Sequence, residues 1–200
     1  MKKNILTLLS GLFVVCTLFF VACGEENKCT NECGVHGTLV QTNCSCNCEA
    51  GYKLDVINGR CDVKIACYDM IGDFKSTSVK RATLPSTVEK DYNNYTINVS
   101  EALDDATGQK VRLKNLSEFE CTVNGVVAVY YVEGAMKGDS VIFNKTACKT
   151  DFVGKGFFTR DATTKKVTKF TVVYNATYDV TENGVTKKVT DKCTEVFSKN

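Results

Sequence analysis

The sequence predicts a mostly β protein in two units: a small disulfide-rich module followed by an antiparallel up-and-down β-barrel of about eight strands. Two observations carry this prediction. Six of the twelve cysteines fall within residues 29–61. After residue 67 the chain alternates apolar and polar residues between regularly spaced turn signals, which is typical of half-buried antiparallel strands. A β-sandwich is the alternative architecture for the second unit.

Composition excludes several classes of function. Hydrophobic residues make up 44% and charged residues 24% of the 200 residues, as in ordinary globular proteins. The net charge of +2 gives no reason to expect nucleic acid as a partner. The single histidine, His36, leaves little room for a His-based metal site or triad. No nucleophile elbow or phosphate-binding loop occurs, so we expect no enzyme, no catalytic residue and no cofactor.

The first 22 residues have the pattern of an export signal. Lys2 and Lys3 precede an uncharged, mostly apolar run over residues 5–22 that ends on a small residue, Ala22. A basic start, an apolar middle and a small final residue are typical of a secretory signal peptide. We therefore expect residues 1–22 to be removed and the protein to leave the cytoplasm.

The end of this run, Phe20-Val21-Ala22-Cys23, resembles a bacterial lipobox. The resemblance implies that Cys23 becomes the mature N-terminus and carries a diacylglyceryl thioether and an acylated amine, such as a palmitate. Two or three acyl chains anchor a protein stably in a membrane, and residues 23–28 would form a lipidated tether. A plain secretory signal and an uncleaved single anchor are the alternatives.

The residues after Cys23, Gly24-Glu25-Glu26-Asn27, resemble the acidic export tag of surface lipoproteins in anaerobic gut Gram-negative bacteria. The resemblance implies an outer-membrane lipoprotein that is exposed at the cell surface. The alternative is that the two glutamates belong to a solvated tether and specify no location.

Ten cysteines remain after Cys16 leaves with the signal and Cys23 takes the lipid. An even number in an exported chain predicts five disulfides. So short a stretch as residues 29–61 cannot bury enough apolar surface to fold without cross-links. The Cys-x-Cys-x-Cys spacing would also suit a thiolate zinc site, but an oxidising compartment favours disulfides, so no metal is expected.

Residues 29–62 resemble an EGF-like module. The motif Cys46-Asn47-Cys48-Glu49-Ala50-Gly51-Tyr52, closed by Cys61, looks like the second half of that module, and the turn Cys33-Gly34-Val35-His36-Gly37-Thr38 looks like its first half. Leu39 stands where the family usually has a cysteine, and Cys44 takes that role. The resemblance implies three disulfides: Cys29–Cys44, Cys33–Cys46 and Cys48–Cys61.

Alternation defines the strands of the second unit. Two apolar faces stand out: Tyr95, Ile97 and Val99 in one strand, and Phe170, Val172, Tyr174, Ala176 and Tyr178 in the longest one. We expect strands near residues 70–79, 92–100, 110–117, 126–133, 139–146, 153–161, 166–179 and 185–197. A closed barrel of this size has no free edges.

Glycine-containing pairs mark the turns between these strands. Asn124-Gly125 and Asn183-Gly184 are strong hairpin signals because both residue types tolerate positive φ. Thr107-Gly108, Glu133-Gly134 and Lys137-Gly138 predict further turns. Few residues connect the two units around positions 62–66, and no shared core is evident, so we expect the units to be separable.

Residues 68–198 also resemble a group of lipoproteins with a lipocalin-like (calycin-like) barrel. The resemblance rests on the following runs: Ile71-Gly72-Asp73-Phe74, Tyr95-Thr96-Ile97-Asn98-Val99, Val111-Arg112-Leu113-Lys114-Asn115-Leu116, Val129-Tyr130, Asp139-Ser140-Val141-Ile142-Phe143, Phe152-Val153-Gly154-Lys155-Gly156-Phe157 and the strand at Val167–Tyr178. It implies a lipocalin-like β-barrel over residues 67–200. The Gly-x-Trp signature of true lipocalins is absent, since the chain has no Trp.

Four cysteines lie outside the first unit: Cys67, Cys121, Cys148 and Cys193. They allow three pairings. A closed barrel brings its first and last strands together, which favours Cys67–Cys193 as a lock on closure. Cys121–Cys148 would then tie a turn to the following hairpin.

The run Asp139-Ser140-Val141 resembles the O-glycan acceptor of the same bacteria, which makes Ser140 a glycosylation candidate. The alternative is a hairpin turn that enters a strand.

For function, we expect a lipid-anchored envelope or cell-surface protein that acts as a binding or interaction module, with an unidentified glycan, protein or small apolar ligand. A structural envelope component without a small ligand is the alternative, and a hydrolase is the weakest hypothesis. An aromatic-lined cavity would favour binding, whereas a solidly filled barrel would favour the structural role.

Overall fold

The computed structural model describes residues 29–118, 121–123 and 125–200. The expected signal peptide at residues 1–22 and the tether at 23–28, with Cys23, lie outside the described residues. The described part is nearly all β. Its helical turns are two short 3-10 segments, η1 (Tyr68–Met70) and η2 (Leu116–Glu118).

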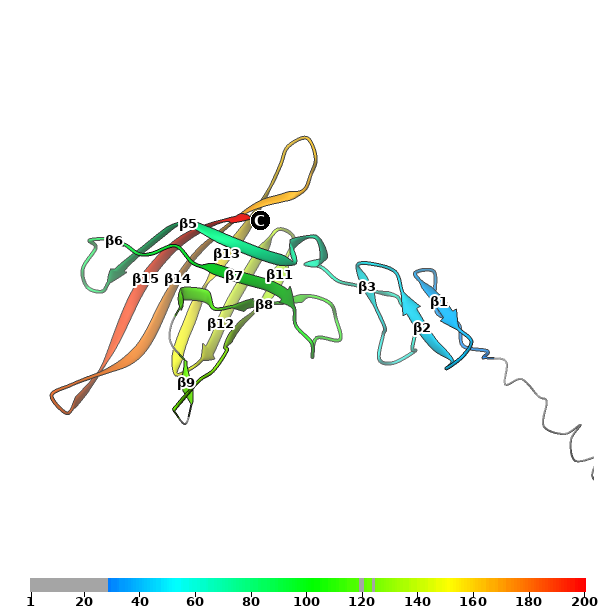
Figure 1. The fold of residues 1–200 in the computed structure, drawn as a ribbon, viewed down its shortest axis with the longest axis horizontal. Helices are drawn as coiled ribbons and strands as arrows, with labels where there is room; N and C mark the ends of the chain where they lie inside the picture. The colour runs from blue at the N-terminus through cyan, green and yellow to red at the C-terminus, as the bar shows by residue number, and fades with distance from the viewer. Residues whose placement is uncertain (1–28, 119–120, 124) are drawn as a thin grey trace, which may run out of the picture.

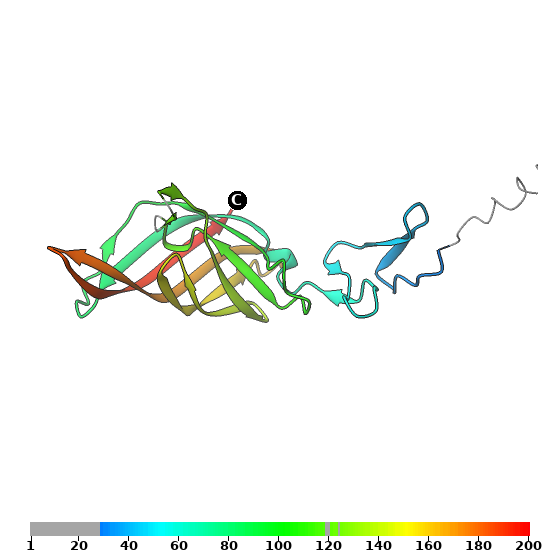
Figure 2. The same ribbon diagram turned by 90° about the horizontal axis from the view of Figure 1, so that it is seen from below.

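Residues 72–199 form a closed barrel of eight antiparallel strands (Figures 1 and 2). The strands are β5 (Gly72–Thr83), β7 (Thr96–Glu101), β8 (Lys110–Lys114), β11 (Tyr131–Lys137), β12 (Ser140–Ala147), β13 (Thr150–Arg160), β14 (Val167–Glu182) and β15 (Val185–Lys199). Each strand pairs with the next one listed, and β15 pairs with β5 to close the circle. A short strand, β6 (Lys90–Asp91), adds to β5. The predicted eight-stranded antiparallel barrel is therefore confirmed.

The faces predicted from alternation point inward. Ile97 and Val99 are fully buried and Tyr95 is 7% exposed. In β14 the buried residues are Phe170, Val172, Tyr174 and Ala176, as predicted. Tyr178 is half-buried, because β14 continues beyond the barrel there and pairs with β15 alone.

One predicted strand is wrong. Residues 126–133 do not form one barrel strand: residues 126–127 form β10, which pairs with β9 (Thr122–Val123) in a separate hairpin. The barrel strand is β11, and Gly134 lies within it. A Cβ at Gly134 would lie 2.4 Å from Val141 Cγ2. Gly134 therefore allows neighbouring strands to pack closely. The turn predicted at Glu133-Gly134 is wrong.

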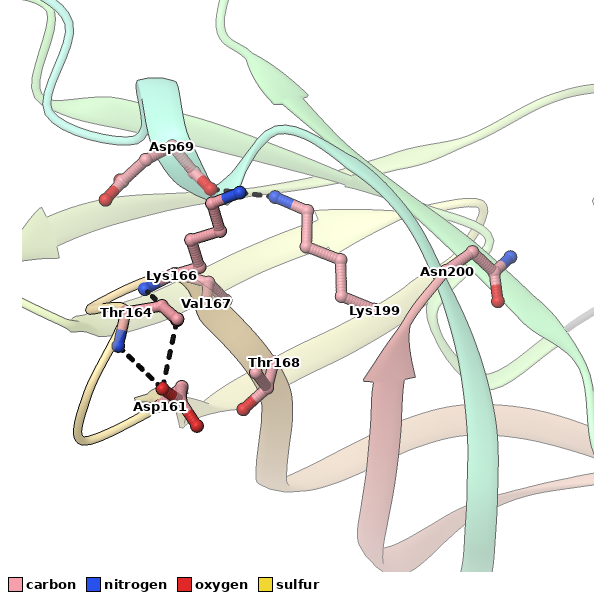
Figure 3. Close-up of a pocket in the computed structure, with 8 residues that line it drawn as sticks. All are labelled: Asp69, Asp161, Thr164, Lys166, Val167, Thr168, Lys199 and Asn200. Carbon is pink, nitrogen blue, oxygen red and sulfur yellow. Dashed lines mark hydrogen bonds between the residues drawn. The ribbon is translucent and has the colours of Figure 1, made fainter.

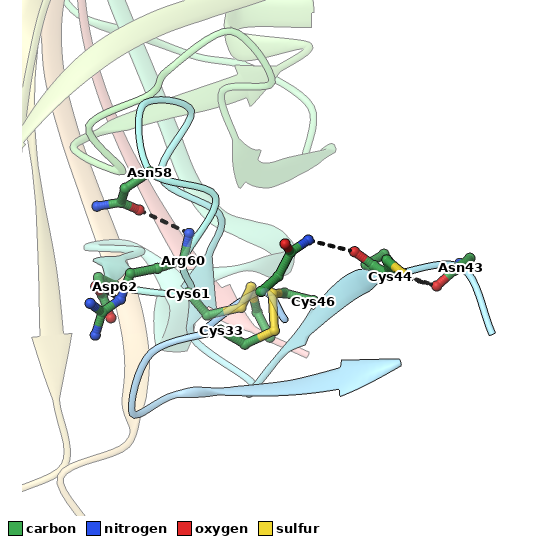
Figure 4. Close-up of a disulfide and its surroundings, with 11 residues drawn as sticks. Cys33, Asn43, Cys44, Cys46, Asn58, Arg60, Cys61 and Asp62 are labelled. Atoms are coloured by element: carbon green, nitrogen blue, oxygen red, sulfur yellow. Dashed lines mark hydrogen bonds and ion pairs between the residues drawn. A yellow bond between two sulfur atoms is a disulfide. The ribbon is translucent and has the colours of Figure 1, made fainter. Parts of the chain in front are cut away.

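The disulfide-rich region lies beyond one end of the barrel (Figure 1). It contains two short hairpins, made of β1 (Gly37–Val40) with β2 (Ser45–Cys48) and β3 (Tyr52–Lys53) with β4 (Val63–Lys64). Their sheets are too small to form a core, so the disulfides hold them together. The bonds present are Cys29–Cys44, Cys33–Cys46 and Cys48–Cys61, which is the pairing that the EGF-like resemblance implied. Figure 4 shows Cys33 and Cys46 with their surroundings.

In the barrel, Cys121 and Cys148 are bonded, but the predicted Cys67–Cys193 bond is wrong. Both cysteines are buried free thiols. Cys193 pairs with Arg81 in the β15–β5 ladder, whereas Lys199 pairs with Phe74 near the start of β5. Six residues of strand separate these positions, about 20 Å at ~3.3 Å per residue, and Cys67 precedes β5. Pairing of two strands brings two residues together only if the register also places them opposite each other, and here it does not.

The two units share contacts at their junction. Ile65, in the segment that connects the two units, is 9% exposed and packs into the barrel core. The Ala66 N–H donates to the Gly108 carbonyl over 2.8 Å. Lys53 Nζ from β3 donates to Glu101 Oε1 over 2.5 Å and to the Asp105 carbonyl. One half-buried lysine thus joins the disulfide-rich region to the end of β7 and the β7–β8 loop.

Candidate functional site

Aromatic side chains fill the interior of the barrel. Six of its aromatic residues are 2% exposed or less: Phe74, Phe143, Phe152, Phe170, Tyr174 and Phe197. Their rings pack against one another, and the rings of Phe158 and Phe170 stack with centroids 4.2 Å apart. Within the described residues, this packing is typical of a hydrophobic core. The cavities described next lie on the outside of the barrel.

A buried polar cluster surrounds Glu195, which is fully buried. The Tyr95 hydroxyl donates to Glu195 Oε2 over 2.5 Å, and the Tyr174 hydroxyl donates to Oε1 over 2.8 Å. Arg81 Nη2 lies 3.4 Å from Oε1. Burial raises the pKa of Glu195, and the bonds from these three residues act in the opposite direction. Burial also holds the pKa values of both phenols well above 10.

The same cluster fixes η2 across this end of the barrel. The Ser117 N–H donates to the Tyr95 hydroxyl over 2.7 Å, and Arg81 Nη2 donates to the Ser117 carbonyl over 2.7 Å. Ser117 has a φ of 72° and is 1% exposed. Glu195, Tyr95, Tyr174 and Ser117 are buried, and the Arg81 side chain is 11% exposed, so the polar groups of the cluster bond mainly to one another. Sequence reasoning missed it, although Glu195 stands at an inward position between Cys193 and Phe197.

The opposite end of the barrel carries an external cavity of about 570 Å³ (Figure 3). It lies between η1, the β13–β14 loop and the end of β15. Its lining residues are Asp69, Asp161, Thr164, Lys166, Val167, Thr168, Lys199 and Asn200. We call it the terminal cavity.

Two lysines converge in the terminal cavity. Lys199 Nζ donates to the Asp69 carbonyl over 2.7 Å, and the Lys166 side chain also runs toward Asp69 (Figure 3). Within the described residues neither ammonium forms an ion pair. Burial lowers the pKa of Lys199, and the nearby Arg160 charge lowers it further against the effect of Asp69. The cavity is lined by these two lysines and by two carboxylates, those of Asp69 and Asp161.

The carboxylates near these lysines already have partners. Asp69 forms an ion pair with Arg160, whose hydrogen bond lowers the pKa of Asp69. Arg160 Nε also donates to Asp139 Oδ1 over 2.8 Å. Asp161 Oδ1 accepts the N–H groups of Thr163 and Thr164 over 3.0 and 2.7 Å, which shapes the β13–β14 turn.

A second cavity, of about 330 Å³, lies between the disulfide-rich region and the barrel. Its lining residues are Ala50, Gly51, Tyr52, Lys64, Ile65, Ala66, Tyr68, Asp69 and Arg160. We call it the junction cavity. Asp69 lines both cavities, so the two cavities are neighbours. We call the two together the groove.

Two tyrosine rings are held in place in the junction cavity. The Tyr52 ring stacks on His36 with centroids 3.6 Å apart and planes at 13°. The Tyr68 ring lies against Gly51, where a Cβ would be 3.4 Å from its Cδ1, and Tyr68 remains 48% exposed. Each ring has one face covered by protein. Sequence reasoning placed His36 in a turn and Tyr52 in the motif that resembles the second half of an EGF-like module, and it had no signal for Tyr68.

The predicted site residues lie elsewhere. The bonded cysteines are structural cross-links. Ser140 is half-buried at the start of β12, beside the Asp139 that binds Arg160. The described residues contain no group of three side chains suited to hold a metal ion. In the same part of the chain, no helix has the length and apolar character needed to cross a membrane.

Comparison with known proteins gives little to assign a family. No protein-family profile matches the chain, and no curated protein matches it. A crystal structure of a protein of unknown function from Bacteroides ovatus is similar, with 13% sequence identity and a TM-score of 0.38. The similarity covers 65% of this chain and 41% of that one.

Proposed function

We propose that the chain is a lipid-anchored cell-surface protein that works as a binding module, with its ligand in the groove formed by the terminal and junction cavities. The observation that carries this proposal is the filled barrel beside an open groove. Aromatic rings occupy the interior, whereas the groove outside offers exposed tyrosine and lysine side chains in cavities of about 570 and 330 Å³. Those volumes fall in the range of small-molecule sites.

The identity proposed with this function has three parts: a lipid on Cys23, an EGF-like first module and a lipocalin-like second one. The lipobox-like ending at Ala22-Cys23 supports the anchor. The disulfides of the described residues support an exported protein, since such bonds persist in oxidising compartments. The chain order then puts the disulfide-rich region between the anchor and the barrel as a spacer.

The test is a capture experiment with the soluble chain that begins at Cys29, using a glycan array and extracts of the extracellular environment. We expect a ligand to be retained, and retention to fall when Tyr68 is replaced by Ala. Val185→Ala at the start of β15, where Val185 is 68% exposed, is the control and should retain the ligand. Capture that is insensitive to Tyr68→Ala would place the ligand outside the groove.

The filled interior also favours the second candidate function, a structural envelope component without a small ligand. The two proposals separate in cells that lack the protein. A structural component predicts altered envelope integrity, measured as sensitivity to detergent, with no ligand captured by the soluble chain. A binding module predicts a captured ligand and an intact envelope.

A further inference from the structure

We propose that one outer face of the barrel lies on the surface of an anionic lipid bilayer. The face is the outward side of residues 140–144 in β12, 153–159 in β13, 169–177 in β14 and 190–198 in β15, and we call it the basic face. This inference goes beyond the proposed function, because the basic face includes none of the residues that line the groove.

Apolar side chains form a contiguous patch on the basic face. Ile142 is 56% exposed, Val153 is 49% exposed and Phe157 is 42% exposed. Lys155 lies between Val153 and Phe157 along β13, and its partners across the sheet are Ile142 and Val173. A depression of about 550 Å³ lies on this patch, and Ile142, Val153 and Val173 line it. Single exposed apolar residues are common, but a contiguous patch marks an interaction surface.

The charged side chains of the basic face are lysines. Lys155, Lys169 and Lys192 point outward, and none of them forms an ion pair with a described residue. The carboxylates in these segments are Asp191 and Glu195, which point inward and are 5% and 0% exposed. In this part of the described chain, therefore, three positive charges face outward and no carboxylate does.

The opposite side of the barrel carries charges of both signs that pair with one another. Arg112 of β8 forms ion pairs with Glu133 of β11 over 2.7 Å and with Asp104 over 3.4 Å. Asn98 of β7 donates to Asp73 of β5 over 2.7 Å. In the closed ring, β7 and β8 lie four strands away from β13 and β14. The excess of positive charge is therefore confined to one side of the barrel.

An anionic lipid surface matches both parts of this chemistry. At the boundary of a bilayer, apolar side chains enter the edge of the acyl region while lysines extend to the headgroups. Each lysine near an anionic surface strengthens the contact about fivefold. A second copy of the chain fits poorly, because pairing of two basic faces brings like charges together. The lipid expected on Cys23 holds the chain at a membrane, and the resulting effective concentration lets a face of modest area bind.

The test uses the full mature chain, residues 23–200, attached to vesicles through an N-terminal histidine tag and nickel-chelating lipids. Cys23→Ser in this chain makes the experiment independent of acylation. The chain has no tryptophan, so a single introduced tryptophan reports on its own position. Phe157→Trp places the reporter on the basic face, and Thr96→Trp, at an exposed position of β7, is the matched control. Quenching by nitroxide-labelled lipids measures contact with the bilayer.

We expect Phe157→Trp to be quenched on vesicles of phosphatidylcholine and phosphatidylglycerol, and Thr96→Trp to be unaffected. On phosphatidylcholine alone the quenching should be lost. Val153→Trp, at a second exposed position, should behave like Phe157→Trp and covers the case in which that variant misfolds.

The lysines are tested by charge removal in the Phe157→Trp background. Lys155→Gln with Lys192→Gln should lower the ratio of contacting to free molecules about 25-fold. Lys110→Gln with Lys114→Gln, on β8, makes the same change of net charge on the opposite side and should leave this ratio unchanged.

Several results would overturn the inference. Equal quenching of Phe157→Trp and Thr96→Trp would mean that no face is preferred. Equal quenching on neutral and anionic vesicles would remove the charge argument, and no quenching of either variant would remove the membrane contact. An emission shift of Phe157→Trp with protein concentration in the absence of vesicles would assign the face to contact between copies. A shift with polyglutamate but not with vesicles would assign it to an acidic protein. None of these results bears on the capture experiment with Tyr68→Ala, because Tyr68 lies outside the basic face.

Discussion

Raising the pH above about 10 should destabilise the barrel through two buried phenols, those of Tyr95 and Tyr174. Burial holds the pKa values of both well above 10, so they stay protonated in the folded state while the unfolded chain ionises. An acid whose pKa is raised by folding contributes stability below its unfolded pKa and loses it as the pH rises. This loss of stability is therefore absent at pH 7 and grows as the pH rises above about 10.

The magnitude follows from the number of phenols. Each one that ionises only on unfolding costs about 1.4 kcal/mol of unfolding free energy per pH unit above its unfolded pKa of about 10. Two of them cost about 2.7 kcal/mol per unit. A domain with a total stability of about 5–15 kcal/mol would show this clearly between pH 10 and 11.

The assay is guanidinium unfolding followed by far-ultraviolet circular dichroism at several pH values. Tyr174→Phe should reduce the loss of stability by about 1.4 kcal/mol per pH unit. It should also lower stability at pH 7 by about 1–3 kcal/mol, because a hydrogen bond to Glu195 is lost. Tyr131→Phe, which removes the hydroxyl of a side chain that is 44% exposed, is the control. An unchanged pH slope in Tyr174→Phe would refute the reasoning.

Four further predictions test other parts of the structure. Gly156→Ala should lower the free energy of unfolding by about 1–3 kcal/mol, because its Cβ would lie 2.5 Å from a buried phenylalanine ring; thermal melts measure this. Lys53→Met should speed proteolysis between the two units, since it removes the ion pair and hydrogen bond that join them, while the barrel still melts cooperatively. Peptide mapping after alkylation of the unfolded, unreduced protein should find Cys67 and Cys193 as modified thiols; a bond between them would contradict the structure. Cys23→Ala should move the protein from the membrane to the soluble fraction, and continued membrane association after signal removal would mean a different anchor.

The barrel could be predicted because its signal is local. Alternation in the strands around Ile97 and Phe170 is visible in windows of a few residues, and each strand buries one face. The prediction of a turn at Gly134 was wrong because a glycine that permits close packing of strands and a glycine that permits a turn look alike in a sequence. Only the neighbouring side chain, Val141, distinguishes them.

The groove could not be predicted because its residues meet only in the closed barrel. Tyr52 and Lys199 come from opposite ends of the described chain, and closure of β15 on β5 brings the C-terminus beside η1. No local sequence motif indicates that these residues lie close together. The prediction of a Cys67–Cys193 bond was wrong for a related reason. The predicted topology indicates which strands pair, but it does not give the register between them.

Packing of the barrel controls how reactive its two free thiols are toward disulfides. Burial raises the pKa of Cys67 to about 11 and that of Cys193 to about 12. Only the thiolate attacks a disulfide, so at neutral pH both thiols of the folded protein are almost wholly in the unreactive protonated form. If the barrel opens, each becomes an ordinary thiol with a thiolate fraction of a few per cent near neutral pH. Variants that loosen the barrel should therefore accumulate mispaired disulfides, so correct cross-linking reports on how well this core is packed.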